Sequence, residues 1–377
     1  MVKKSKVPEG YKLTELGVIP EDWKVSKWGD VLDGFTSGAT PYRAIKSYYK
    51  GNVKWVTSGE LNYNYIYDTI EHISKEAVEK THLKIHPSGT FLMAITGLEA
   101  EGTRGSCGIL GSPATTNQSC MAIYGTDKVT VNYLFYYYLM FGNDLAFKYC
   151  QGTKQQSYTA KIVKNLPIIH PINIKEQQAI AEVLSDVDNL ITSLEKLIDK
   201  KQKIKQGIMQ ELLTGRKRLP GFTGEWEVKK VKEFGEIVTG GTPSTVIKEF
   251  WNGKIPWVTP TDISNRKEIY DTERKITELG LNKLRKLPAG SVLITCIASI
   301  GKNAILKIAG ACNQQINAII PYSDYDSDFL YYLFENNKRY LLSNAGITAT
   351  NIISKKDFSE LEFKVPMLKN NKPLLIS

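Results

Sequence analysis

The sequence predicts an α+β protein in which two tandem α/β domains are connected by a long coiled-coil-type α-helix. Three observations support this fold class. The chain matches itself at an offset of about 200 residues, each copy combines short apolar runs with an aromatic segment, and an amphipathic stretch without proline separates the copies. A chain of 377 residues has room for two or three domains, each with its own core.

The repeat consists of five pairs of segments that occur in the same order in both halves. Their offsets are 203, 202, 202, 201 and 196 residues, so a length difference lies between Thr96 and Gly108. Five matches in register indicate a tandem duplication. The pairs are 21–25 with 224–228, 37–41 with 239–243, 53–57 with 255–259, 88–93 with 289–294, and 117–123 with 313–319.

Each copy combines strand and helix patterns. Short apolar segments bounded by glycine and proline, such as 255–258 and 316–320, predict strands. An aromatic segment with helical spacing follows in each copy, at 133–141 and at 329–340. The repeated unit is therefore a mixed α and β domain.

The segment 174–214 predicts one long helix between the copies. It contains no proline, and Pro171 before it and Gly215 after it are typical boundary residues. A helix of about 40 residues is roughly 60 Å long, which favours a rigid spacer over a helix lying across the cores of its own domains. Apolar residues recur at the spacing of a coiled-coil seam, at Ile180, Leu184, Val187, Ile191, Leu194, Ile198, Ile204, Ile208 and Leu212.

Charge is unevenly distributed along this helix. The first half is acidic, whereas eight basic and two acidic residues between Lys196 and Arg218 supply +6 of the formal net charge of +10. Two such helices packed antiparallel would place opposite charges together, so the pattern calls for a second helix. Clustered positive charge also indicates a polyanionic partner, although charge runs on helices are often only solvated faces.

Composition excludes several protein classes. The chain is 42% hydrophobic and 23% charged, which is typical of folded protein throughout. No apolar run reaches the roughly 18 residues of a membrane span, so we expect a cytoplasmic protein without a membrane partner. The five cysteines include no Cys-x-x-Cys pair, so they predict buried thiols rather than disulfides or a zinc site.

A search for catalytic motifs finds none. His82 and His86 have the spacing of a helical ligand pair, but Pro87 would break that helix. Gly38 and Gly240 precede Thr-Pro pairs without a following helix N-terminus, which favours structural turns over phosphate loops. We therefore expect no catalytic residue, no metal and no cofactor in this chain.

The remaining candidates for function are basic and polar residues where the two copies differ most. Differing loops on a repeated scaffold are where recognition usually resides, and these side chains suit phosphate positioning and base-edge readout in DNA. The candidate DNA-binding residues are Arg43, Lys46, Arg104, Lys154 and Gln155 in the first copy, and Lys248, Arg266, Lys302, Thr350 and Asn351 in the second.

Seven segments together resemble one known family. They are Leu16-Gly-Val-Ile-Pro-Glu-Asp-Trp-Lys-Val25, Lys175-Glu-Gln-Gln-Ala-Ile180, Leu213-Thr-Gly-Arg-Lys-Arg-Leu-Pro-Gly-Phe222, Gly224-Glu-Trp226, Ile255-Pro-Trp-Val-Thr-Pro-Thr-Asp-Ile263, Ser299-Ile-Gly-Lys302 and Asn313-Gln-Gln-Ile316. In this order, over nearly the whole chain, they resemble the specificity subunit of a type I restriction-modification system.

The resemblance implies a non-catalytic DNA-binding subunit with two target-recognition domains. Each domain would contact one half of a split DNA sequence, and the helix would set the unread gap and dock methyltransferase subunits. Those subunits would use S-adenosylmethionine and would hold ATP- and Mg-dependent restriction subunits. The implied boundaries are an N-terminal arm at 1–20, recognition domains at 21–172 and 216–368, a spacer helix at 173–215, and a tail at 369–377.

The end of the sequence departs from the family pattern. In that pattern a second helix follows the second recognition domain and pairs with the first, whereas here residues 364–366 lead directly into the tail. We interpret the tail as truncated. One hypothesis is a frameshift, because a shifted frame of compatible codons for 369–377 reads Glu-Gln-Gln-Ala-Ile-Ala-Asp-Ile, close to residues 176–183. An uncovered helix seam would favour self-association.

Three alternatives stay open at this point. The chain could be a truncated subunit that is inactive or self-dimerising, a fragment of a fused restriction-modification enzyme, or a structural coiled-coil adaptor. Complete framing segments at both domain starts argue against a random fragment. Steep salt dependence of DNA binding would separate a DNA reader from an adaptor.

Overall fold

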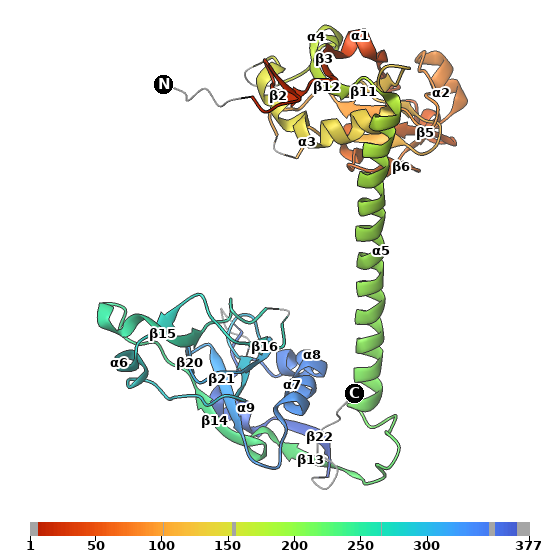
Figure 1. The fold of residues 1–377 in the computed structure, drawn as a ribbon. Helices are drawn as coiled ribbons and strands as arrows, with labels where there is room; N and C mark the ends of the chain where they lie inside the picture. Colours follow the sequence, from red (N-terminus) through yellow and green to blue (C-terminus); the bar gives the residue numbers. More distant parts are fainter. Residues whose placement is uncertain (1–6, 101, 153–155, 265, 347–350, 368–377) are drawn as a thin grey trace. The chain divides into compact units, whose positions relative to one another are not determined.

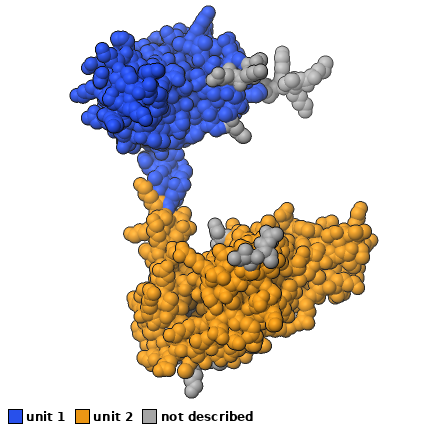
Figure 2. Space-filling view, turned by 180° about the vertical axis from the view of Figure 1, so that it is seen from behind, with its two compact units in different colours: residues 1–195 blue, residues 196–377 orange. Residues whose placement is uncertain are grey.

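The computed structural model divides the chain into two compact units, residues 1–195 and 196–377 (Figure 2). The division falls within one continuous helix, and each unit contains one copy of the repeat. In the part of the chain that the structure describes, no helix is long and apolar enough to cross a membrane. The described residues are 7–100, 102–152, 156–264, 266–346 and 351–367.

The first unit is built around a five-stranded sheet with the order β4-β11-β8-β9-β6. Figure 1 labels two strands of this sheet, β11 and β6. All its pairings are antiparallel except β6 with β9. A three-stranded sheet, β10-β5-β7, and two ribbons, β12-β3 and β1-β2, complete the strands. The strands are β1 (Tyr11–Thr14), β2 (Gly17–Pro20), β3 (Trp23–Lys27), β4 (Asp33–Ser37), β5 (Val53–Val56), β6 (Tyr65–Ile66), β7 (His72–Ile73), β8 (Phe91–Ala94), β9 (Cys107–Leu110), β10 (Thr115–Thr116), β11 (Cys120–Tyr124) and β12 (Pro167–Pro171).

Helix α3 (Val131–Tyr149) packs its aromatic face on this sheet, in contact with β8 and β9. Thr130 starts the helix by accepting a hydrogen bond from the backbone N–H of Tyr133. In the core, the rings of Trp28, Phe91 and Tyr138 meet edge to face at 5.6–6.4 Å. The shorter helices are α1 (Trp28–Val31), η1 (Lys46–Tyr49), η2 (Ser58–Glu60), α2 (Lys75–Lys80) and α4 (Ala160–Asn165).

The second unit repeats strands β3 to β12 of the first unit one by one. Its five-stranded sheet has the order β14-β21-β18-β19-β16, and its other sheets are β17-β15-β20 and β13-β22, so each strand number is ten higher than that of its counterpart. The elements are β13 (Trp226–Lys230), η3 (Val231–Glu233), β14 (Gly235–Thr239), η4 (Lys248–Phe250), β15 (Trp251–Val258), β16 (Glu268–Ile269), β17 (Lys275–Ile276), α6 (Glu278–Leu281), β18 (Val292–Thr295), β19 (Asn303–Leu306), β20 (Ala311–Cys312), β21 (Ile316–Pro321), α7 (Ser327–Asn336), α8 (Lys338–Ser343), α9 (Lys355–Glu360) and β22 (Glu362–Pro366).

This matching topology, in α+β domains that flank one long helix, confirms the predicted fold class. The strand predictions at 255–258 and 316–320 fall within β15 and β21, and the aromatic segments form α3 and the α7–α8 pair. The length difference predicted after Thr96 falls in the connection from β8 to β9, which is longer than its counterpart between β18 and β19.

The repeated Gly-x-Thr-Pro segments are tight structural turns. A Cβ atom on Gly38 would collide with the carbonyl oxygen of Thr116, and one on Gly240 would collide with that of Asn313. A larger residue would therefore push the turn off strand β10 or β20. In each copy a buried tryptophan indole donates to a carbonyl of this turn. The segments thus pack against backbone and are not open cradles for phosphate.

The long helix α5 spans Ile174–Leu212, 39 residues, or about 58 Å at the usual helical rise. Its first turns are fixed to the first domain: Glu176 accepts a hydrogen bond from the Trp23 indole, and Asp188 accepts one from the Tyr136 hydroxyl. Gln177 and Ala181 are the buried residues of α5. From Val183 to Ile208 the apolar side chains of the helix are exposed, whereas the seam residues Ile180 and Leu212 are partly buried.

Candidate nucleic-acid interface

Two loops that are distant in sequence lie side by side in the first domain. The connection 95–106 runs from β8 to β9, and the segment 151–157 follows α3. The backbone N–H of Leu98 donates to the carbonyl of Gln156 at 3.1 Å, and the Gln156 N–H donates to the Glu99 carboxylate at 2.8 Å. Bridges between Gln151 and Ser157 and between Thr96 and Ser157 close the pair. Two regions that the sequence singled out separately therefore form one loop pair.

The second domain has the same loop pair at the equivalent place. Ala298, in the connection from β18 to β19, donates its N–H to the carbonyl of Asn351 at 3.1 Å. Ile352 forms bridges with Ile297 and with Gly346, as Ser157 does with Thr96 and Gln151. The candidate residues Lys302 and Asn351 thus belong to one surface element, and both are exposed. The candidates Lys154, Gln155 and Thr350 lie outside the described residues.

Arg104 is bound within its own loop. Its guanidinium donates to the carbonyls of Leu98 and Glu99, at 2.9 and 3.2 Å, and lies 5.7 Å from the ring centre of Phe147. These contacts hold the turn of the loop. The structure therefore places Arg104 where it shapes the loop pair, with part of its side chain exposed.

Arg43 is also engaged by neighbours. Its two terminal nitrogens pair with the two carboxylate oxygens of Glu71, at 2.5 and 2.8 Å, and the guanidinium lies over the rings of Tyr49 and Trp55. The hydrogen bonds to Glu71 raise the pKa of Arg43 and lower the pKa of Glu71. A phosphate would have to compete with this bidentate pair.

In the second domain another arginine takes the same place. Arg274 lies 4.1 Å from the ring centre of Trp251 and 4.9 Å from that of Trp257, the counterpart of Trp55. The self-alignment pairs Arg274 with His72, not with Arg43, so the sequence could not reveal this equivalence. A cation over the buried tryptophan is common to both copies, which indicates a packing role.

Lys46 and Lys248 occupy equivalent positions at the start of η1 and η4. Both are exposed, and neither forms an ion pair among the described residues. Exposed apolar side chains flank them: Ile45 and Tyr42 in the first domain, Ile247 and Val246 in the second. The lysines were predicted from the sequence, whereas these apolar neighbours were not, although Ile45 recurs as Ile247 at an offset of 202.

The remaining candidate, Arg266, precedes β16. It is exposed and its backbone N–H donates to the hydroxyl of Ser264. In the chain it lies in a segment separate from η4 and from the loop pair, and among the described residues no hydrogen bond or ion pair joins it to either.

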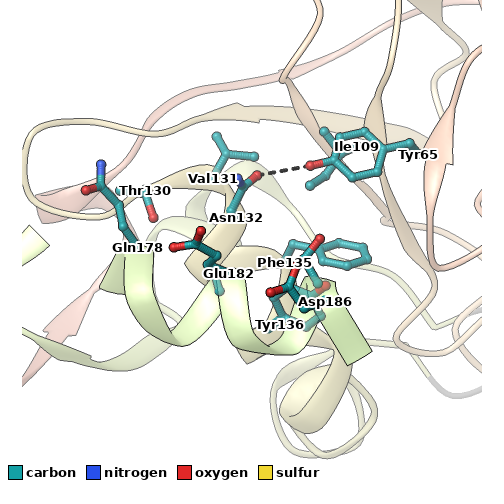
Figure 3. Close-up of a pocket in the computed structure, with 12 residues that line it drawn as sticks. Tyr65, Ile109, Thr130, Val131, Asn132, Phe135, Tyr136, Gln178, Glu182 and Asp186 are labelled. Carbon is teal, nitrogen blue, oxygen red and sulfur yellow. Dashed lines mark hydrogen bonds between the residues drawn. The ribbon is translucent and has the colours of Figure 1, made fainter. Parts of the chain in front are cut away.

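An acidic cavity of about 420 Å³ lies between α5, the start of α3 and β6 (Figure 3). The side chains of Glu182 and Asp186 line it from α5, and Tyr65 donates a hydrogen bond to Asn132 across it. Two carboxylates would repel a phosphate group. This side of the first domain is therefore unsuited to DNA, in contrast to the lysine-bearing loops.

The histidines and cysteines have structural environments. His86 is buried and hydrogen-bonded to the Tyr124 hydroxyl, and burial, together with the nearby Lys84, lowers its pKa to about 4. Four cysteines are buried and Cys150 is partly buried. Among the described residues, no three His, Cys, Asp or Glu side chains are grouped as metal ligands would be.

Comparison with known proteins identifies the family. The family model described as the type I restriction modification DNA specificity domain matches residues 20–206 and 223–373. The two matches together cover most of the chain, one for each copy of the repeat. The chain belongs to this family. The resemblance noted in the sequence is thereby confirmed.

Curated relatives in this specificity family are themselves specificity subunits. The MjaIX specificity subunit of Methanocaldococcus jannaschii is 40% identical over 148 residues, which cover 38% of this chain and 34% of the relative. The HindI specificity subunit of Haemophilus influenzae is 34% identical over 146 residues, 37% of this chain and 32% of the relative. The chain thus spans about a third of the length of these two relatives. The putative MjaX specificity subunit of M. jannaschii is 24% identical over 387 aligned positions, covering 97% of this chain and 88% of the relative.

Solved structures of the specificity family share the fold. The S subunit of the type I restriction-modification system from M. genitalium superposes with a TM-score of 0.61 at 14% identity, covering 98% of this chain and 89% of that one. A chain from a study of complex assembly and conformational transition of the type I system gives 0.54 at 17% identity, covering 93% and 88%. Both likenesses extend over both domains and the long helix.

Proposed function

We propose that this protein is the non-catalytic specificity subunit of a type I restriction-modification complex, in which each domain reads one half of a split DNA target. The observation that carries the proposal is the duplicated domain whose scaffold matches strand by strand while its loops differ. Family membership and the relatives, which are specificity subunits, support it. A repeated scaffold with different loops suits the reading of two different half-sites.

The loop pairs and the η1 and η4 segments supply the DNA contacts in this proposal. Lys46, Lys248 and Lys302 are exposed and suited to phosphate oxygens, and Asn351 is suited to a base edge. Each good bidentate base contact discriminates by about 1–3 kcal/mol. Lysines that release counterions on binding make the affinity steeply salt-dependent.

Helix α5 has two tasks in the proposed complex. Its length sets the number of base pairs between the two half-sites, and the helix offers the docking surface for methyltransferase subunits. The exposed apolar residues support a protein interface along this helix, because a helix that keeps so many apolar side chains in water is typical of one. S-adenosylmethionine, ATP and Mg belong to the partner subunits in this proposal, with restriction subunits bound through the methyltransferase.

Methylome sequencing tests the proposal directly. Cells that carry this gene together with its methyltransferase partner should methylate adenines in a motif with two specified halves and an unspecified gap. Replacing residues 97–106 by 298–302 should change one half of the motif and leave the other half and the gap unchanged. A motif without a gap, or salt-independent binding to DNA, would contradict the proposal and favour an adaptor role.

A further inference from the structure

Helix α5 carries a continuous apolar stripe that nothing in the described structure covers. Ten side chains along it are between 40% and 64% exposed. They begin beside an apolar groove of about 320 Å³, which Leu184 lines together with residues of α3 and the β1-β2 ribbon. The residues of the stripe are Val183, Leu184, Val187, Leu190, Ile191, Leu194, Leu197, Ile198, Ile204 and Ile208.

The stripe forms three columns with a period of seven residues. Val187, Leu194 and Ile208 lie in the central column, and the columns through Leu184 and Leu190 flank it. A two-stranded coiled coil needs only two apolar columns. The third column widens the stripe beyond a simple coiled-coil seam and increases the area that a partner helix can bury.

Charge along the stripe determines which helix direction fits. Between residues 174 and 191 there are four acidic residues and one basic, whereas between 195 and 205 there are five basic and two acidic. A helix with the same sequence is therefore complementary when it runs in the opposite direction. In the parallel direction like charges would face each other along the whole length.

The packing register leads to the same result. A two-fold axis between Thr192 and Ser193 places Ile191 opposite Leu194 of the second copy, and Val187 opposite its Ile198. Both of these layers are apolar. In the third column, the same axis brings residues 190 and 183 near residues 197 and 204 of the second copy, which are apolar as well.

Lys201 and Lys205 decide against the parallel arrangement. Both lie at seam positions in the heptad, so a parallel pair would bury each lysine against itself. In the antiparallel pair Lys201 lies opposite Leu184 of the second copy, one helical turn from its Asp188. The long lysine stem can cover the leucine while the ammonium group reaches water or the carboxylate.

We propose that α5 pairs antiparallel with α5 of a second copy of this chain, with the two-fold axis between Thr192 and Ser193. The proposal goes beyond DNA reading and does not depend on it. The pairing buries the stripe on both helices and places the acidic half of each α5 beside the basic half of the other.

The first test is the mass of the purified full-length chain by sedimentation and light scattering at micromolar concentration. The expected mass is twice the chain mass of 42.4 kDa. The double variant Ile191→Glu with Leu194→Glu places four carboxylates around the axis and should halve this mass. Circular dichroism of the variant should match that of the wild type, because both residues are half-exposed in the described structure. The unfolding midpoint should fall only by the stabilisation that the dimer contact supplies.

The matched control is Ile70→Glu with Leu279→Glu. These two side chains are 88% and 59% exposed and lie outside α5, one in each domain. The control should remain dimeric. A dimeric Ile191→Glu, Leu194→Glu variant, or a control that becomes monomeric, would overturn the assignment of the interface to α5.

Spin labels test the helix direction. The background is Cys150→Ser, in which the four remaining cysteines are buried. A spin label attached at Thr192→Cys should lie at the same height along the helix axis as the label on the second copy. Labels at Gln206 should be separated by about 40 Å along the helix axis. Equal label distances at both positions would indicate a parallel pair and refute the proposal. A wild-type chain that is monomeric refutes it too, even if α5 then binds a methyltransferase.

Discussion

Gln177 in the first turn of α5 accepts a hydrogen bond from the backbone N–H of Thr130, which starts α3, at 3.0 Å. Its amide nitrogen also donates to the carbonyls of Lys128 and Pro171, at 2.8 and 2.9 Å. The side chain is fully buried, and these three bonds satisfy both polar atoms of its amide. The buried Gln177 amide thereby adds to the hydrogen bonds of Glu176 and Asp188 that fix the long helix to the first domain.

Gln177→Leu should lower the free energy of unfolding of the first domain by about 2–3 kcal/mol, because it leaves buried backbone groups without partners. Urea unfolding monitored by tryptophan fluorescence measures this loss. Gln178→Leu is the matched control, since Gln178 is the next residue of the same helix turn, is exposed, and should change stability little when replaced. Equal effects of the two variants would show that the buried amide does not fix the helix.

The salt dependence of DNA binding should change when the charge of Lys46 is removed but not when the charge of Arg43 is removed. Lys46→Ala should lower the magnitude of the slope of log affinity against log salt by about 1, as expected when one phosphate contact is lost. Lys248→Ala should do the same in the second domain. Fluorescence anisotropy with a DNA duplex that contains the methylated motif, at several salt concentrations, gives the slopes.

Arg43→Ala provides the contrast for that experiment. Its guanidinium already pairs with Glu71 and lies over Tyr49 and Trp55, so the salt slope should stay near the wild-type value. Because the pair is partly exposed, the loss of stability should not exceed about 1 kcal/mol. A loss of slope in Arg43→Ala equal to that in Lys46→Ala would make Arg43 a direct phosphate ligand.

His86 should make the stability of the first domain depend on pH. Burial lowers its pKa to about 4, whereas an unfolded histidine titrates near 6.5. Between these values the unfolded chain binds more protons, so the free energy of unfolding rises with pH. The contribution is fully present above about pH 6.5 and is lost as the pH falls toward 4.

Thermal unfolding at pH 7 and at pH 5 tests this dependence. The midpoint should be higher at pH 7, and His86→Gln should reduce the difference between the two pH values. Carboxylates titrate in the same range, so only the change between wild type and variant reports on His86. An unchanged difference between the two midpoints would mean that another group, such as the buried His170, dominates the pH dependence.

More of the fold than of the site could be predicted from the sequence. Two copies of one strand pattern reinforce each other, so the repeat indicated a duplicated mixed α and β domain and the place of the length difference after Thr96. The helix bounds followed from Pro171 and Gly215, because these residues stop helices for local steric reasons. Such signals depend on neighbours in sequence.

The site depends on neighbours in space, which the sequence did not reveal. Arg43 resembled a free DNA ligand until its bidentate pair with Glu71, 28 residues away, was visible. The equivalence of Arg43 and Arg274 was hidden because the two arginines reach equivalent tryptophans from different segments of the repeat. The adjacency of 97–106 and 151–157 likewise arises from a tertiary bridge between Thr96 and Ser157.

Ala298 and Gly97 share an unusual backbone conformation within the two loop pairs. Their φ angles are 62° and 73°, in the left-handed region that favours glycine, and they occupy equivalent positions at an offset of 201. A Cβ atom on Gly97 would meet only the Thr103 methyl group, at an ordinary 3.8 Å, so any penalty there comes from the backbone.

Ala298→Gly should therefore stabilise the second domain by about 0.5–1 kcal/mol, the strain relieved less the added entropy of the unfolded chain. Gly97→Ala should destabilise the first domain by about 1 kcal/mol. Urea unfolding of both variants measures the two changes in the free energy of unfolding, which should have opposite signs. The N–H of Ala298 holds Asn351, so Ala298→Gly should also leave the methylated motif unchanged. A destabilising Ala298→Gly would mean that the loop, not the backbone angle, determines the preference for alanine.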